Sequence, residues 1–239
     1  MLFRSVLDPP TVGDMEVLRG FALRHAVRIY LQSGGPESVV PLDPSQAGED
    51  LCYAIPAWGL SLRFGPVDFI QVHPEVNLRM IDQAIELLEP VATDRVLDLY
   101  CGMGNFTLPL AKRAGEVTGI EGARPAIERA RQNAAAAGLT NTRFIEADLG
   151  GAGAEGAWTR EAFDLALLDP PRTGAAELLP VLAGVGARRI VYVSCHPGTL
   201  ARDAGLLVAA HGYRLLAAGV MDMFPQTSHV ESMALFVKK

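Results

Sequence analysis

The chain of 239 residues has few cysteines and lacks long apolar runs. Its three cysteines, Cys52, Cys101 and Cys195, form no Cys-x-x-Cys pair. An odd, widely spaced set of this kind argues against a disulfide framework, a zinc site and an iron–sulfur cluster. No uncharged apolar stretch approaches the length of a membrane span, and the first residues lack the pattern of a signal peptide. We therefore expect a protein of the reducing cytoplasm that holds no metal.

The chain also lacks a net positive charge. Its 21 lysines and arginines stand against 27 aspartates and glutamates, which gives a net charge of −6 at neutral pH. Such a chain has no overall attraction to nucleic acid, so any contact with RNA must come from a local patch or from an additional module. Arginine supplies 18 of the 21 cations, which is a weak hint of phosphate contacts.

Residues 1–73 differ in composition from the rest, and clusters of proline and glycine interrupt them. Within them we predict a helix over 13–26 and strands over 27–31 and 60–64, which together form a small α+β appendage. An amphipathic helix over 74–88 then opens a larger domain that extends to residue 239.

Strands and helices alternate through the larger domain. This order predicts a doubly wound, mostly parallel α/β sheet. No helix separates the last two strands, so we expect them to form an antiparallel hairpin at one edge. The predicted strands are 96–100, 117–121, 142–146, 165–168, 190–193, 213–221 and 232–237; the predicted helices are 105–114, 125–137, 175–185 and 199–211; a glycine-alanine loop occupies 150–156.

A loop with two glycines follows the first strand of this domain. Gly102 and Gly104 permit a tight turn and a close approach to a ligand, but Thr107 replaces the third glycine of a dinucleotide fingerprint. Glu121 ends the next strand, where an acid can accept hydrogen bonds from both ribose hydroxyls. Asp148 follows the third strand, in reach of an adenine ring. This layout fits S-adenosylmethionine better than NAD.

Near the ends of the later strands, three side chains carry the functional groups that addition chemistry needs: Cys195, Asp169 and Glu231. Cys195 ends a strand and precedes a helix whose N-terminus favours the thiolate. Asp169 opens an Asp-Pro-Pro-Arg segment that places a carboxylate on rigid backbone, and Glu231 follows a loop near the end of the chain. Methylation of a pyrimidine at C5 needs such a set, because thiolate addition at C6 activates C5 and a base must then remove the C5 proton.

These segments resemble the bacterial 23S ribosomal RNA 5-methyluridine methyltransferases, within the RNA uracil-C5 methyltransferase family. The resemblance covers residues 69–239 well and the first 68 weakly. It implies a seven-stranded Rossmann-like methyltransferase sheet, S-adenosylmethionine as cofactor, and a uridine in RNA as substrate, with 23S ribosomal RNA favoured and tRNA as the alternative. It also implies that Cys195 is the nucleophile and Glu231 the base. The cofactor-binding residues that we assign are Gln71, Tyr100, Gly102, Asn105, Glu121, Asp148 and Asp169.

The sequence departs from this family in two places. Position 196 is usually asparagine and is His196 here. Full family members carry a small RNA-binding β-barrel, and many carry a four-cysteine iron–sulfur cluster, before this region. We find neither, so we expect no such cluster and predict either an excised catalytic fragment or a naturally short, monomeric member with weak affinity for RNA.

Several alternatives stay open. Another methyltransferase on the same fold, such as a base N-methylase, would not need Cys195. A fragment that only binds cofactor or RNA, and a nicotinamide oxidoreductase, are further candidates. His229 has a role either in the loop or in support of the base, and Arg172 and Arg202 bind either phosphates or carboxylates.

Overall fold

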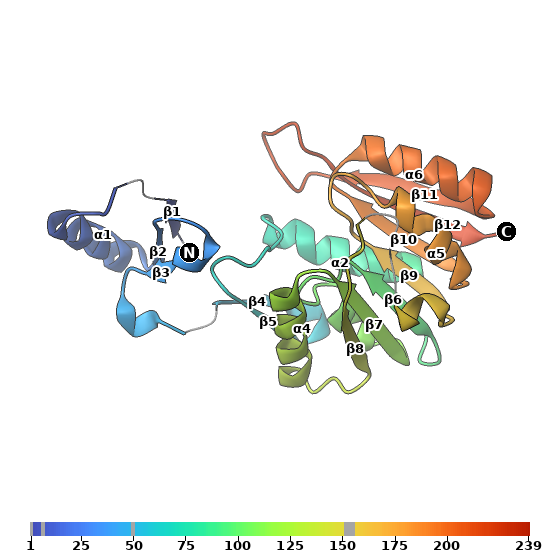
Figure 1. The fold of residues 1–239 in the computed structure, drawn as a ribbon, viewed down its shortest axis with the longest axis horizontal. Helices are drawn as coiled ribbons and strands as arrows, with labels where there is room; N and C mark the ends of the chain where they lie inside the picture. Colours follow the sequence, from blue (N-terminus) through green and yellow to red (C-terminus); the bar gives the residue numbers. More distant parts are fainter. Residues whose placement is uncertain (1, 6–7, 49–50, 151–155) are drawn as a thin grey trace. The chain divides into compact units, whose positions relative to one another are not determined.

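The computed structural model describes residues 2–5, 8–48, 51–150 and 156–239 (Figure 1). Most of the predicted loop 150–156 therefore lies outside the described residues. The chain forms two units, one of residues 1–53 and 63–69 and the other of residues 54–62 and 70–239. Within the described ranges, no helix is long and apolar enough to cross a membrane.

The smaller unit contains one helix and a three-stranded sheet. The helix starts at a capping box between Thr11 and Asp14. The small hydrophobic core of this unit consists of Ile29, Leu31 and Leu42. The first strand of the sheet runs parallel to the second, and the third is antiparallel to it. The elements are β1 (Leu2–Ser5), α1 (Val12–His25), β2 (Ile29–Gln32) and β3 (Val40–Pro41). The sequence did not reveal β1 and β3, because strands this short carry no readable alternation.

A two-stranded hairpin connects the units. It consists of β4 (Leu51–Ile55) and β5 (Leu60–Phe64), and a short turn of 3-10 helix, Pro56–Trp58, joins them. The predicted strand over 60–64 matches β5.

The larger unit is built on a seven-stranded sheet with helices on both faces (Figure 1). Its strand order is β11–β12–β10–β9–β6–β7–β8, and all pairs are parallel except those that β12 makes with β10 and β11. This confirms the predicted doubly wound sheet and the antiparallel edge hairpin. The strands are β6 (Arg95–Leu99), β7 (Glu116–Glu121), β8 (Thr142–Glu146), β9 (Leu165–Leu168), β10 (Arg189–Ser194), β11 (Tyr213–Met221) and β12 (Glu231–Lys238).

Apolar stripes bind the helices to this sheet. On α2 the side chains of Met80, Ile81, Ala84 and Leu88 are all fully buried, and this helix contacts β9, β10 and β12. Two predicted helices are shorter than expected. Turns occupy residues 101–106, so α3 begins only at Thr107, and the first turn of the predicted helix 175–185 is of 3-10 type. The helices are α2 (Pro74–Leu88), α3 (Thr107–Ala111), α4 (Arg124–Ala136), α5 (Leu179–Gly184) and α6 (Pro197–Ala210).

Candidate active site

The parallel strands bring their carboxyl ends to one edge of the sheet. Residues selected from the sequence lie at the end of β7 and in the segments that follow β6, β8, β9 and β10, and this is the edge where ligands bind in open α/β sheets. In strand order along the sheet these residues are Cys195, Asp169, Tyr100, Glu121 and Asp148.

The loop after β6 has an unusual backbone. Tyr100, Gly102 and Gly104 all adopt positive φ angles, of 62°, 53° and 98°. Glycine tolerates this region, whereas a tyrosine there must be held by its surroundings. Its hydroxyl donates a hydrogen bond to the carbonyl oxygen of Leu149 at 3.1 Å. The loop is therefore tied to the segment that follows β8.

Beneath this loop, Asp98 is fully buried in β6. It accepts a hydrogen bond from the hydroxyl of Thr107, so the residue that replaces the third fingerprint glycine anchors the first turn of α3. The other carboxylate oxygen, Oδ1, has no hydrogen-bond partner among the described residues. Burial, opposed by the Thr107 hydrogen bond, raises the pKa of Asp98 to about 7.

Backbone amides orient the carboxylate of Glu121. Its Oε2 accepts a hydrogen bond from the Gly102 amide at 3.1 Å, and its Oε1 accepts one from the Ala123 amide at 2.8 Å. Both oxygens are therefore fixed at the end of β7, and each keeps a lone pair for a further donor.

A cavity of about 670 Å³ opens beside this carboxylate. Tyr100, Glu121 and Asp148 line it, as the sequence analysis predicted for a common pocket. Arg202 and residues 171 and 173–178 also line the cavity, and the sequence analysis did not assign them to it. Gln71, Gly102, Asn105 and Asp169 are not among the residues that line it.

Asn105 instead contacts the helix before the sheet. Its Nδ2 donates to Oδ1 of Asn77 at 2.9 Å, and Nδ2 of Asn77 donates to Oδ1 of Asn105 at 3.1 Å. Asn77 is 4% exposed on α2 and was not noticed in the sequence. This reciprocal pair joins α2 to the glycine loop. The sequence feature that could have revealed this contact is an asparagine on an otherwise apolar face of the helix.

The antiparallel strand β12 brings the two predicted catalytic residues together. The last pair of the β10–β12 ladder is Ser194 and Ser232, and the hydroxyl of Ser232 donates to the Ser194 carbonyl at 2.9 Å. Cys195 directly follows Ser194 and Glu231 directly precedes Ser232, so the two residues lie at the same end of this ladder, where Glu231 is near enough to raise the pKa of the Cys195 thiol. Glu231 is 2% exposed, whereas Cys195 is partly exposed. The predicted base is thus buried beside an accessible thiol.

Acidic groups dominate the electrostatics of this corner. Burial raises the pKa of Glu231 to about 8, with a further contribution from Asp169, and burial raises the pKa of Asp169 to about 7. The pKa of Cys195 is also raised, by burial and then by Glu231 and Asp169, and the charge of Arg172 only partly opposes this. Each of these three groups therefore retains its proton to higher pH than it would in water.

The expectation that the helix N-terminus favours the Cys195 thiolate stays a prediction, and burial and the nearby acids oppose such an effect because they raise the pKa. One amide of that N-terminus is already occupied, because Nδ1 of His196 accepts a hydrogen bond from the Thr199 amide at 3.1 Å. His196 thereby caps α6, a role that asparagine also fills well at helix N-termini.

The remaining polar residues of the predicted site have defined partners. Nη2 of Arg172 lies 3.1 Å from Nε2 of His229, and the His229 ring packs edge-on against Phe224 at 5.9 Å between centroids. Nη2 of Arg202 lies 2.7 Å from Oδ1 of Asp203. Of the two alternatives for Arg202, the structure supports contact with a carboxylate.

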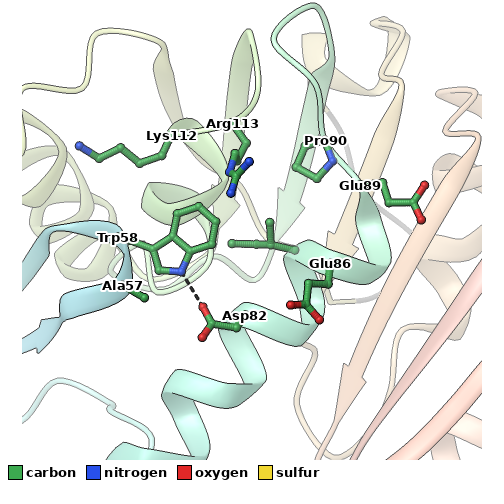
Figure 2. Close-up of a pocket in the computed structure, with 9 residues that line it drawn as sticks. Ala57, Trp58, Asp82, Glu86, Glu89, Pro90, Lys112 and Arg113 are labelled. Atoms are coloured by element: carbon green, nitrogen blue, oxygen red, sulfur yellow. Dashed lines mark hydrogen bonds between the residues drawn. The ribbon is translucent and has the colours of Figure 1, made fainter.

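A second cavity, of about 600 Å³, lies where α2 and α3 end, near the amino ends of β6 and β7 (Figure 2). The indole Nε1 of Trp58 donates to Asp82 at 2.7 Å, and the guanidinium of Arg113 lies 5.5 Å from the centroid of the indole. These side chains satisfy one another, and none of the predicted site residues lines this cavity. We interpret it as a packing feature of the hairpin tip. In the part of the chain that the structure describes, no group of three or more potential ligands is placed to hold a metal ion.

Comparison with known proteins places these features in one family. The sequence model of the family described as tRNA (Uracil-5-)-methyltransferase matches residues 58–150 and 156–239. The 23S rRNA (uracil(1939)-C(5))-methyltransferase RlmD of Alkalilimnicola ehrlichii is 54% identical over all of this chain and 53% of its own length. The RlmD of Methylococcus capsulatus is 51% identical over 99% of this chain and 53% of its own length. The chain thus spans about half the length of these curated relatives.

Solved structures agree with this placement. The tRNA (uracil-54, C5)-methyltransferase of Pyrococcus abyssi, in complex with S-adenosyl-L-homocysteine, superimposes with a TM-score of 0.70 and 29% identity over 88% of this chain and 50% of that one. Trm5b of Pyrococcus abyssi shares the fold, with a TM-score of 0.69 and 17% identity over 98% of this chain and 72% of that one. The chain belongs to the tRNA (uracil-5-)-methyltransferase family.

Proposed function

We propose that this chain is the catalytic part of an enzyme that methylates C5 of a uridine in RNA, with S-adenosylmethionine as methyl donor. The observation that carries the proposal is that Cys195 and Glu231 lie at the same end of the β10–β12 ladder, with Asp169 close enough to raise the pKa of both. Methylation of an exocyclic nitrogen needs no thiol beside a buried carboxyl group. A protein that only binds cofactor or RNA needs neither residue.

The relatives favour ribosomal RNA as the substrate. The RlmD proteins at 51–54% identity are named for a uridine of 23S rRNA. The alternative is a tRNA uridine, which the more distant Pyrococcus abyssi enzyme is named for. The proposal includes RNA as the partner, the cytoplasm as the compartment and a single chain as the acting unit.

The residues beside the larger cavity fit S-adenosylmethionine. Glu121 is held with a lone pair free on each oxygen, which suits two ribose hydroxyls, and Asp148 lies on the same wall, where it suits the adenine ring. Among the residues that the structure describes, the buried Oδ1 of Asp98 has no hydrogen-bond partner, and the positive charge of a cofactor near it would compensate for that. The other residues that we propose for cofactor binding are Gln71, Tyr100, Gly102, Asn105 and Asp169.

Cys195 would begin the reaction. Its thiolate adds to C6 of the uracil, and the electron pair of the C5–C6 double bond moves onto O4 as an enolate. The proton of the thiol must first be removed, because burial and the nearby carboxyl groups raise the pKa of Cys195. Asp169, with its pKa raised to about 7, can hold a proton and donate it to the edge of the uracil.

Glu231 would complete the reaction. S-adenosylmethionine supplies a methyl group on a sulfonium, which the activated C5 carbon attacks. The carboxylate of Glu231 then takes the proton from C5, the electron pair re-forms the C5–C6 bond, and Cys195 leaves as a thiolate. A base that is 2% exposed suits this step, because bulk water cannot protonate it freely.

Trapping with 5-fluorouridine RNA tests the proposal. Because fluorine replaces the C5 hydrogen, the base has no proton to remove and elimination is blocked. The covalent adduct with Cys195 should therefore persist on a denaturing gel in the presence of cofactor. Cys195→Ala should abolish the adduct, whereas Cys52→Ala, which changes an exposed cysteine of the smaller unit, should retain it. An adduct of full yield in Cys195→Ala would exclude the assigned nucleophile.

A further inference from the structure

We propose that Asp203 is the positioning residue of this active site, because its carboxylate holds the loop after β9 and the end of β10 at a fixed separation. The proposal rests on the function proposed above. It assigns a role to a residue that touches no predicted reacting atom and that the sequence analysis left without one.

Asp203 is fully buried, and its carboxylate accepts hydrogen bonds from β10, from the loop after β9 and from its own helix, α6. Its Oδ2 accepts one from the hydroxyl of Tyr192 at 2.6 Å and one from the amide of Ala175 at 2.8 Å. Its Oδ1 accepts one from Nε of Arg202 at 2.8 Å. A buried carboxyl group with this many donors is costly to disturb, because removal of one partner leaves the others unsatisfied.

Asp203 and its two partners outside α6 belong to segments that carry the chemistry. Tyr192 lies on β10, three positions before Cys195. Ala175 lies in the loop that begins with Asp169 and contains Arg172. Asp203 itself is on α6, the helix that starts directly after Cys195. One carboxyl group thus connects the nucleophile's strand, the nucleophile's helix and the loop with the second carboxyl group.

The same loop forms a wall of the proposed cofactor cavity. Nη2 of Arg202 donates to the carbonyl oxygen of Thr173 at 2.8 Å, and both residues line the cavity. Gly174 has φ of 75°, and a Cβ at this position would lie 2.6 Å from Oδ2 of Asp203 and 2.6 Å from Nη2 of Arg202. The loop therefore lies directly against the Asp203–Arg202 pair, and its backbone has no room to move closer.

The chain contains a matched control at the other end of the sheet. Asp94 is 4% exposed, and like Asp203 it accepts hydrogen bonds from an arginine and from a backbone amide. Its partners are Arg188, with both contacts at 2.9 Å, and the amide of Val91 at 2.9 Å. Asp94 precedes β6, so it is remote from the carboxyl edge where the site lies.

The experiment compares Asp203→Asn with Asp94→Asn well below the melting temperature of either variant. We expect Asp203→Asn to weaken binding of S-adenosylmethionine, measured by calorimetry, by about tenfold or more, since it removes charge-assisted hydrogen bonds. At saturating cofactor, its rate of adduct formation with 5-fluorouridine RNA should also fall by about tenfold. Asp94→Asn should lower the melting temperature but change neither quantity by more than about twofold. Equal binding and equal adduct rates in the two variants would overturn the proposal.

Two measurements keep the proposal testable independently of the proposed function. Hydrogen exchange at the Ala175 amide and the rate of Cys195 alkylation by iodoacetamide need neither RNA nor cofactor. Both should change in Asp203→Asn and remain as in the parent in Asp94→Asn. Should the parent form no adduct, the proposed function fails, whereas unchanged exchange and alkylation in Asp203→Asn would overturn the role of Asp203. If Asp203→Asn does not fold, Tyr192→Phe replaces it in the experiment, because it removes only one hydrogen bond to Asp203. We expect the same changes in Tyr192→Phe, but smaller.

Discussion

Glu231 begins β12 and Cys195 directly follows β10, so each is the chain neighbour of one member of the Ser194–Ser232 pair that ends the antiparallel ladder between these strands. The pairing of two adjacent strands therefore brings the predicted base and the predicted nucleophile to the same end of the sheet. A ladder of this kind fixes which residues face each other, because a shift by one residue would turn every side chain to the opposite face of the sheet.

Glu231→Gln should allow methyl transfer to the RNA but slow the release of the methylated RNA from Cys195. The amide cannot accept the C5 proton, so addition and methylation proceed but elimination slows, and a covalent adduct with ordinary uridine RNA accumulates on denaturing gels. Glu128→Gln, which changes an exposed residue of α4, serves as the control and should give no such band. A parent-like absence of adduct in Glu231→Gln, with RNA bound and Cys195 intact, would move the base to another residue.

Turnover should rise with pH through about 8. The base must be deprotonated to accept the C5 proton, and the pKa of Glu231 is raised to about 8 in the folded protein. Single-turnover rates at saturating RNA and cofactor should therefore increase from about pH 6.5 to 8.5. A rate that falls over this interval would contradict the assignment of Glu231 as the base.

Stability should change in the opposite direction. The pKa values of Asp98, Asp169 and Glu231 are raised to about 7, 7 and 8, from ordinary values of 3.8, 3.8 and 4.5. The folded protein thus keeps protons that the unfolded chain releases, so this stabilisation is complete below about pH 4 and is lost as the pH rises to about 8. Urea unfolding should show a free energy of unfolding that falls by a few kcal/mol over this range, and Glu231→Gln should flatten the decline. If the free energy of unfolding of Glu231→Gln fell with pH as steeply as that of the parent, this prediction would be wrong.

Cofactor binding should release protons. A sulfonium cation placed near Asp98 and Asp169 favours their charged forms, so S-adenosylmethionine should bind more tightly as the pH rises through about 7. Calorimetry in two buffers of different ionisation enthalpy measures the number of protons released. S-adenosylhomocysteine, which carries no sulfonium, is the matched control and should release fewer. Equal proton release by both ligands would place the sulfonium away from these carboxyl groups.

Gly104→Ala should weaken the glycine loop. Gly104 has φ of 98°, and an added Cβ would lie well inside contact distance of Leu108. We expect a loss of about 1–3 kcal/mol in the free energy of unfolding, together with weaker cofactor binding. Gly184→Ala on α5, where an added Cβ meets nothing within 4 Å, should be neutral or stabilising. A Gly104→Ala variant as stable as the parent would show that this loop accommodates a side chain.

Local sequence patterns predicted most of the larger unit. The helix over 74–88 was predicted with its observed bounds, because its apolar residues recur at helical spacing and a proline occupies its first turn. The strands β8, β9 and β11 also match, since apolar runs bounded by turn residues are a local signal. In the first part of the chain β2 and β5 were predicted, whereas the short strands β1, β3 and β4 were missed.

The sequence by itself determined the kind of sheet, the glycine loop and the acid at the end of the next strand, and it led to the prediction that Cys195 is the nucleophile and Glu231 the base. Only the tertiary structure decided that Asn105 pairs with Asn77, that Arg202 binds Asp203, and that the thiol is harder to ionise than an exposed one. The physical reason is that periodicity and turn chemistry act between neighbours in the chain. Hydrogen-bond partners and desolvation instead depend on which distant segments the fold brings together.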